Sequence, residues 1–349
     1  MSALLRGRGR PSHREVYQRL HIQVSELQER MGGLPLPDEA TGIWRTIWYE
    51  EAHHSTAIEG NTLVLKQVRK LLDEGRAVGN KELSEYLEVK GYAEAADWVY
   101  RQAIRPEGLS THGRVVTLAE VREIHRAAMS PVWEVAPHRQ ATDREAPGSY
   151  RRHDIYTFPG GMTPVSWPLI AGNLTSWEDE VNSLDRNSLM FPEALAGTHC
   201  RFEQIHPFID GNGRTGRLVL NLVLVRLGYP PVVIYKRDRS KYLQALQKAD
   251  AGTLNPLGEM LARAILDSLY RFTLPAVAGP TRLVPLEALT SDDLTVAAMR
   301  GAALRGRLQA TRGSDGRWHS SKRWVDEYME SRYRRIPPST SEPTRPTDD

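Results

Sequence analysis

The stretch of sequence that decides the fold runs from His206 to Arg217 and reads His-Pro-Phe-Ile-Asp-Gly-Asn-Gly-Arg-Thr-Gly-Arg. It lies between two segments, 192–205 and 218–225, that we expect to be helical. The second segment is apolar on nearly all sides, which predicts a helix buried in the core. A short turn between two helices therefore carries an imidazole, a carboxylate, a Gly-Asn-Gly sequence and two guanidinium groups.

The residues that precede and begin the second helix are suited to hold an anion. Gly211, Asn212 and Gly213 let backbone N–H groups face a ligand, and the start of the helix adds partial positive charge. Arg214 and Arg217 are three residues apart, so their guanidinium groups can face the same anion. Together these features predict a binding site for the phosphates of a nucleotide.

Two further side chains add chemistry to this site. Asp210 directly precedes the glycines and is placed to hold Mg²⁺, which prefers one or two carboxylates together with phosphate oxygens and water. An unperturbed histidine has a pKa of about 6.5, and we interpret His206 as the general base for a target hydroxyl. The sequence therefore predicts transfer of a nucleotide's phosphate group onto a hydroxyl.

At every fixed position the stretch resembles the signature of the Fic (filamentation-induced-by-cAMP) family, His-x-Phe-x-Asp-Gly-Asn-Gly-Arg-x-x-Arg. The resemblance covers residues 40–270 and implies a mostly α-helical core with a short β-hairpin, the flap. It also implies an Mg²⁺-dependent protein adenylyltransferase that moves AMP from ATP to Ser, Thr or Tyr hydroxyls of a protein target. Gly213 stands where the related Doc-type kinases carry lysine, which favours transfer of AMP over phosphorylation.

The resemblance implies a role for each residue of the signature. His206 would deprotonate the target hydroxyl, and Phe208 would anchor the loop in the core. Asp210 would hold Mg²⁺ between the α and β phosphates. The anion hole would consist of Gly211, Asn212 and Gly213, while Arg214 would hold the phosphates and Arg217 would reach the γ-phosphate.

An upstream segment, Ser55-Thr-Ala-Ile-Glu-Gly60, resembles the family's inhibitory motif. The resemblance implies that Glu59 pairs with Arg217 and denies this arginine to the γ-phosphate. An Arg–carboxylate pair competes directly with an Arg–phosphate pair, so the expectation is physically sound. The same glutamate could instead act as a base for water, which leaves an AMP-removing or bifunctional enzyme as an alternative.

Residues 148–165 resemble the flap. The segment Ile155-Tyr156-Thr157-Phe158 is β-prone, and Pro159-Gly160-Gly161 follows as a turn, which predicts a short hairpin. An extended target segment would pair with its edge. The alternative is a loop with two short strands and no partner.

Helical spacing of apolar residues predicts the rest of the core. The expected helices lie near residues 12–31, 40–58, 65–74, 82–104, 117–129, 169–184, 192–205, 239–249 and 256–272. We expect 1–39 to be a loose or helical N-terminal segment, 40–272 the core, 273–289 a linker rich in proline, and 336–349 a disordered tail.

Residues 290–335 predict a second unit, a small α+β module that resembles a winged helix-turn-helix. We expect a helix over 294–304, a basic hairpin over 306–319, and a last helix capped by Ser320 or Ser321. Residues 300–335 hold ten Lys and Arg but four Asp and Glu, a local net charge of +6. DNA and a protein surface both remain candidate partners. A DNA-bound regulator with a nucleotide-sensing core is thus the alternative to an enzyme.

Composition bounds the class of protein. The chain is 40% hydrophobic and 26% charged, which is typical of a globular protein.

Cys200 is the single cysteine, so no disulfide forms within the chain, and no apolar stretch approaches the ~20 residues that span a bilayer. We therefore expect a cytoplasmic protein with no membrane contact. The target, the nucleotide base and the oligomeric state are left open, although relatives of this kind often form dimers.

Overall fold

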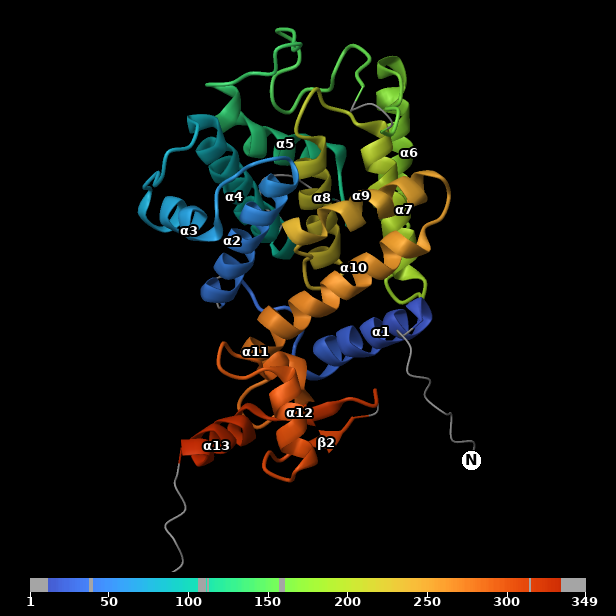
Figure 1. Ribbon diagram of the computed structural model, residues 1–349. Helices are drawn as coiled ribbons and strands as arrows, with labels where there is room; N and C mark the ends of the chain where they lie inside the picture. Colours follow the sequence, from blue (N-terminus) through green and yellow to red (C-terminus); the bar gives the residue numbers. More distant parts are fainter. Residues whose placement is uncertain are drawn as a thin grey trace, which may run out of the picture. The chain divides into compact units, whose positions relative to one another are not determined.

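The computed structural model describes residues 12–37, 40–105, 111, 113–156, 161–313 and 315–333 (Figure 1). The chain divides into two compact units between Val277 and Ala278. The first unit is helical, and the second combines helices with a small antiparallel sheet, which confirms the predicted fold class. None of the described helices is long and apolar enough to cross a membrane.

The helices of the first unit form where the apolar spacing predicts them, with ends shifted by a few residues. They are α1 (His13–Arg30), α2 (Thr41–Ile58), α3 (Leu65–Glu74), α4 (Leu83–Ile104), α5 (Leu118–Trp133), α6 (Ile170–Asn182), α7 (Phe191–Ile205), α8 (Asn212–Arg226), α9 (Arg239–Asp250), α10 (Asn255–Ser268) and α11 (Leu274–Val277). Short 3-10 helices, η1 (Trp167–Leu169) and η2 (Lys236–Asp238), precede α6 and α9, and a π-helical turn, η3 (Leu269–Thr273), joins α10 to α11.

Helix α8 lies in the centre of this unit. Helices α2, α4, α5 and α7 all pack against it (Figure 1), and all residues of 218–225 are buried, as their pattern predicts. The helix begins at Asn212, six residues before the apolar run, because Gly211 has a φ of 75° and starts the helix there. Both arginines of the motif therefore lie on the first turns of a buried helix.

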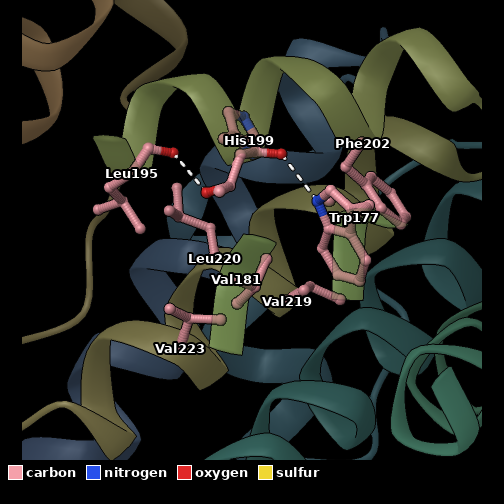
Figure 2. A pocket seen from close by; sticks show the side chains of 10 residues that line it. Trp177, Val181, Leu195, His199, Phe202, Val219, Leu220 and Val223 are labelled. Carbon is pink, nitrogen blue, oxygen red and sulfur yellow. Dashed lines mark hydrogen bonds between the residues drawn. The ribbon is translucent and has the colours of Figure 1, made fainter. Parts of the chain in front are cut away.

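A small cavity lies in the core between α6, α7 and α8. Figure 2 shows Trp177 and Phe202 at one side of it, with Val181, Val219 and Val223 around the remainder. Its volume is about 10 Å³, which is at the lower limit for a single water molecule. This cavity is a packing defect of the core and is far too small for a nucleotide.

The predicted β-hairpin at 155–165 is wrong for the residues that can be assessed. Neither 154–156 nor 161–165 is in a strand, and Thr157 and Phe158 lie outside the described residues. Side chains bind the backbone at the end of this segment: the Arg151 guanidinium donates to the carbonyl of Val165, and Asp154 accepts from the N–H of Trp167 at 2.7 Å. The described residues of the predicted hairpin therefore form no strand.

The second unit contains β1 (Val284–Pro285), η4 (Leu286–Leu289), α12 (Val296–Leu304), β2 (Thr311–Arg312), β3 (Trp318–Ser320) and α13 (Lys322–Tyr333). Its sheet has the order β1-β3-β2, and both pairs are antiparallel. Ser321 caps α13 by accepting from the N–H of Trp324 at 3.2 Å. The residues that form its small core are Leu286, Leu294, Met299, Ala302, Leu308 and Val325.

The predicted linker over 273–289 has the wrong bounds at both ends. Helix α11 continues the first unit to Val277, and Val284 pairs with Ser320 in the sheet of the second unit. The buried side chain of Leu286 also belongs to the core of that unit. A strand of two residues has too little periodicity to be detected, and the prolines around it were interpreted as signs of a linker.

Helices α4 and α5 pack closely at Gly91. A Cβ on Gly91 would lie 3.1 Å from the carbonyl carbon of Ala128 and 3.2 Å from Cδ of Pro131, while one on Gly172 of α6 would meet nothing within 4 Å. We expect Gly91→Ala to lower the free energy of unfolding by ~1–3 kcal/mol despite the better helix propensity of alanine. Gly172→Ala, the matched control, should raise it by up to ~1 kcal/mol. Urea unfolding measures both values, and a stabilised Gly91→Ala protein would contradict the close packing.

Candidate active site

His206 is the residue that ends α7. It adopts a left-handed conformation, with a φ of 48°, and is alone in this among the described residues other than glycine. Its Nδ1 lies 3.2 Å from the carbonyl oxygen of Glu203, which only accepts, so Nδ1 carries the proton and Nε2 keeps a free lone pair. Burial lowers the pKa of His206 to about 4, which leaves the imidazole neutral near neutral pH, with the lone pair of Nε2 available.

Arg151 fixes the chain on both sides of His206. Its side chain is fully buried, and Nε donates to the carbonyl of His206 at 2.8 Å. Its backbone N–H donates to the carbonyl of Pro207 at 2.9 Å, and Nη1 donates to His153 at 2.9 Å. A buried guanidinium thus takes the place of regular secondary structure in positioning this loop.

The loop from Phe208 to Asn212 is closed on itself and stacked on a second histidine. Asn212 bridges both backbone groups of Phe208, accepting from its N–H at 2.9 Å and donating to its carbonyl at 2.8 Å. The Phe208 ring stacks on His125 of α5, with the centroids 3.7 Å apart. His125 Nδ1 accepts from the N–H of Gly148 at 2.7 Å, so its Nε2 donates to the carbonyl of Asp210 at 3.0 Å.

Neither His125 nor Arg151 was among the predicted site residues. Both are buried polar side chains that hold the loop rather than face a ligand. His125 is far upstream of the motif, inside a helix of ordinary amphipathic pattern, and no signal in the sequence distinguishes it. Burial lowers the pKa of His125 to about 4, so the neutral ring that accepts at one nitrogen and donates at the other is the stable form.

The start of α8 presents unsatisfied donors. No side chain caps the helix at Gly211, and the N–H groups of its first turn have no partner within the helix. Arg214 is buried, and its Nε and Nη1 have no hydrogen-bond partner in the described part of the chain. Its Nη2 lies 3.3 Å from Oδ1 of Asp210, and its Nη1 lies 3.6 Å from Oε1 of Glu88. A buried guanidinium with two donors that lack hydrogen-bond partners fits a bound anion.

Asp210 lies beside these donors. Burial opposes ionisation, but Arg214 and the N–H of Gly211, which donates to Oδ1 at 2.6 Å, hold the pKa of Asp210 below its ordinary value. The described residues contain no group of three or more His, Cys, Asp or Glu side chains that could hold a metal by themselves. One ionised carboxylate at an anion site nevertheless fits Mg²⁺, which takes its other ligands from phosphate and water.

Arg217 is paired with the end of α2. Its Nε donates to Oγ of Ser55 at 2.7 Å, and Nη2 donates to the Ser55 carbonyl at 3.1 Å and to Oε1 of Glu59 at 2.7 Å. Burial would raise the pKa of Glu59, but Arg217 holds it below the ordinary value, so Glu59 is a carboxylate. The structure thus brings the two predicted motifs together across 158 residues of chain.

Glu59 also covers the start of α8. A Cβ on Gly213 would lie 2.5 Å from Oε1 of Glu59 and 3.1 Å from Nη1 of Arg217, so only glycine leaves room for this arrangement. Gly60 follows with a φ of 115° and ends α2. Of the predicted flap residues, Ile155 is half-buried and Tyr156 is 87% exposed, while Thr157 and Phe158 lie outside the described residues.

Glu203 is a further carboxylate that the sequence did not single out. It lies on α7 one turn before His206, and its Oε1 is buried without a hydrogen-bond partner in the described residues. Burial raises the pKa of Glu203 from 4.5 to about 7, and Arg217 only partly opposes this. Protonation of Glu203 therefore favours the folded state.

This pKa shift predicts a pH dependence of stability. Because the pKa is higher in the folded chain, the contribution of Glu203 is complete below its unfolded pKa and is lost as the pH rises through about 7. We expect Glu203→Gln, which carries no charge, to gain stability relative to the wild type between about pH 5 and about pH 8. Urea unfolding at both pH values measures the difference, with the exposed Glu180→Gln as the control. A difference that does not change with pH would contradict a buried, protonated Glu203.

Known proteins share both the sequence and the fold. Residues 115–224 match the sequence model of the Fic/DOC family. The chain is 31% identical over 280 residues to the protein adenylyltransferase Fic of Drosophila mojavensis, which covers 79% of this chain and 52% of that protein. It is 34% identical over 244 residues to the protein of the same name from Drosophila willistoni. This alignment covers 69% of the present chain and 45% of the Drosophila willistoni protein. The chain thus spans about half the length of these relatives.

Solved structures agree with this assignment. Fic-1 from C. elegans has a TM-score of 0.60 at 27% identity, over 74% of this chain and 71% of that one. A Fic domain containing signaling protein from Bacteroides thetaiotaomicron has a TM-score of 0.57 at 26% identity, over 73% and 95%. The buried loop, the donors at the start of α8 and these similarities lead to one conclusion: the chain carries a Fic domain, which matches the Fic/DOC family over residues 115–224.

Proposed function

We propose that the chain is a protein adenylyltransferase, which moves AMP from ATP to a Ser, Thr or Tyr hydroxyl of a protein target. One observation carries the proposal: a neutral His206 with a free Nε2 ends α7, and a short loop leads from it to α8, where buried Arg214 has two donors without a hydrogen-bond partner among the described residues. The relatives from Drosophila bear the name of this activity. The free, buried thiol of Cys200 agrees with a reducing compartment such as the cytoplasm.

In the proposed reaction the target's hydroxyl oxygen bonds to the α-phosphorus of ATP. The bond from this phosphorus to the oxygen of the leaving pyrophosphate breaks, and the hydroxyl proton passes to Nε2 of His206. The N–H groups at the start of α8 and the guanidinium of Arg214 stabilise the negative charge of the phosphates. Mg²⁺ held by Asp210 would add positive charge beside those phosphates.

Glu59 blocks this arrangement in the structure described. It occupies a guanidinium nitrogen of Arg217, which would otherwise hold the γ-phosphate, and its own negative charge lies beside Gly213. Bound ATP would therefore lack the interaction with Arg217 and would be repelled by the carboxylate of Glu59. We propose that this contact keeps the enzyme inactive until α2 moves or Glu59 is displaced.

A second activity of the same site remains compatible with one observation. The Glu59 side chain stays 40% exposed and ionised, so it could accept a proton from water that attacks an AMP-modified hydroxyl. The enzyme would then also remove AMP from its target. Loss of AMP from a modified target on addition of wild-type protein, but not of a Glu59→Gly variant, would support this second activity.

We expect Glu59→Gly to increase AMP incorporation by at least tenfold, because Arg217 becomes free for the γ-phosphate. Glu59→Gly/His206→Ala should show no incorporation, since the base is lost. The measurement is intact-protein mass spectrometry after incubation with ATP and Mg²⁺, with and without a cell extract as the source of targets.

Glu74→Gly is the matched control for this experiment. Glu74 also stands at the end of a helix and forms an ion pair with a nearby arginine, Arg76, at 3.1 Å. It should incorporate no more AMP than the wild type. If Glu59→Gly behaves like Glu74→Gly in every preparation, the proposed inhibition is wrong.

For the second unit we propose contact with DNA. Arg300 on α12, and Arg305 and Arg307 directly after it, are exposed, and none of the three forms an ion pair with another described residue. Ala297 and Ala298 give α12 a surface of small side chains, which lets a helix approach a groove closely. Exposed arginines around a helix of this kind fit the phosphates of a duplex.

The salt dependence of binding tests this proposal. We expect the full chain to bind duplex DNA with an affinity that falls steeply with salt concentration, and the triple change of Arg300, Arg305 and Arg307 to Gln to reduce the log–log slope by about 3. Fluorescence anisotropy at several salt concentrations gives the slopes. The control is a second triple variant, in which Arg30, Arg69 and Arg76 are changed to Gln, because these exposed arginines belong to the first unit. Equal slopes for the wild type and the triple variant at 300, 305 and 307 would exclude this surface.

A further inference from the structure

Glu51 is a buried carboxylate of α2 that the proposed chemistry does not use. The residue is 3% exposed and accepts three hydrogen bonds. Tyr92 and Tyr100 of α4 donate to Oε1 and Oε2 at 2.7 and 2.6 Å, and Nδ2 of Asn221 donates to Oε1 at 2.8 Å. A single side chain therefore ties α2 to both α4 and α8.

Asn221 extends this connection beyond α8. Its Nδ2 also donates to the carbonyl of Val232 at 3.0 Å, and its Oδ1 accepts from the N–H of Val232 at 2.7 Å. Farther along the chain, Nε of Arg239 donates to the carbonyl of Ile58 at 2.6 Å, at the last turn of α2. The α2 segment that carries the inhibitory motif is thus connected to the chain that follows α8 at both ends, through Asn221 at Glu51 and directly by Arg239 at Ile58.

The contacts between α2 and α8 form a ladder with a spacing of one helical turn. Glu51 meets Asn221, Ser55 meets Arg217, and Glu59 meets Arg217 and the space beside Gly213. Residues four apart on each helix meet in opposite order, as expected for two antiparallel helices. The position of Glu59 is consequently set by the same helix face that is fixed at Glu51.

Burial of the Glu51 carboxyl group is unfavourable for the stability of the fold. Burial raises the pKa of Glu51 to about 7, even though three donors oppose the shift. Glu51 has no ion-pair partner among the described residues that would offset the loss of hydration. Buried polar clusters of this kind contribute more to a defined position than to stability, and hydrophobic side chains would pack α2 at lower cost.

We propose that Glu51 is the positioning residue that holds the inhibitory Glu59 on Arg217. The inference rests on the proposed function, because it concerns the inhibition of the same site. While the cluster of Glu51, Tyr92, Tyr100 and Asn221 is intact, α2 cannot shift or rotate away from α8, and Glu59 remains in place. Loss of the cluster frees α2 and makes Arg217 available, although Glu59 itself is unchanged.

Glu51→Gln is the main test variant, since it preserves the shape of the side chain. A glutamine offers one acceptor oxygen, so its amide group replaces either Oε1 or Oε2. In place of Oε1 it faces the amide of Asn221, whose own oxygen is occupied by Val232; in place of Oε2 it requires the Tyr100 hydroxyl to accept instead of donate. We expect AMP incorporation to rise about tenfold, equivalent to ~1.4 kcal/mol less inhibition. Glu51→Gln/Glu59→Gly should match Glu59→Gly alone, because both changes act through the same contact.

Tyr100→Phe is a milder variant, which removes one donor and should give a smaller gain. Each test variant has a matched control. Glu120→Gln removes another fully buried carboxylate, one that pairs with Arg226 at 2.5 Å, and Tyr86→Phe removes another buried hydroxyl of α4, one that donates to Val78 at 2.9 Å. Both controls should lower the melting temperature without raising AMP incorporation.

Hydrogen exchange gives a readout that is independent of activity. Amides of Glu51–Ile58 should exchange faster in Glu51→Gln and Tyr100→Phe than in the wild type, and not in the two controls. Unchanged exchange in both test variants overturns the proposal. It is also overturned if exchange is faster but the test variants incorporate no more AMP than the wild type, while Glu59→Gly does incorporate more. If Glu59→Gly gains no activity, the proposed function fails, and the exchange data alone decide whether Glu51 anchors α2.

Discussion

The burial of the Arg217 guanidinium is the constraint on which the site depends. A cation inside the core requires acceptors, and here Ser55 and Glu59 of α2 supply them. A γ-phosphate could supply the same interaction, so α2 and a nucleotide are alternatives for one buried charge. Any ligand that takes over Arg217 therefore lowers the free energy that holds α2 in place, and any contact that holds α2 weakens binding of the ligand.

The loop that carries His206 shows how an irregular backbone is made rigid. The carbonyl groups of His206, Pro207, Phe208 and Asp210 are each bonded to a group outside the loop or across it, by Arg151, Asn212 and His125. The left-handed backbone at His206 is strained for a residue with a Cβ, and this network maintains it. The left-handed residue ends α7 and lets the chain turn into the loop that leads to the start of α8.

The sequence predicted those parts of the molecule that depend on local pattern. The helices follow from apolar periodicity, and residues 206–217 form one site because a turn and the first helical turns place them together. Arg151, His125 and Glu51 could not be found in this way, since each is a single polar residue whose partners are distant in the chain. The pattern at 155–158 favoured strands, but Ile155, Tyr156 and residues 161–165 form none, and Arg151 binds the carbonyl of Val165 at the end of the predicted hairpin. Which backbone groups side chains will satisfy is decided by tertiary packing, so periodicity could not reveal it.

Helix α2 carries two glutamates on one face, eight residues apart, in opposite environments. Glu51 is buried among hydroxyl and amide donors, whereas the Glu59 side chain is 40% exposed. The difference separates two tasks that a single residue could not perform. A fully buried Glu59 would leave Arg217 only at the cost of rehydration and repacking, while an exposed Glu51 could not fix the helix. If Glu59 competes with a phosphate as proposed, a buried anchor and a more exposed carboxylate would let the exchange proceed by a small movement at the end of α2, with the core behind it intact.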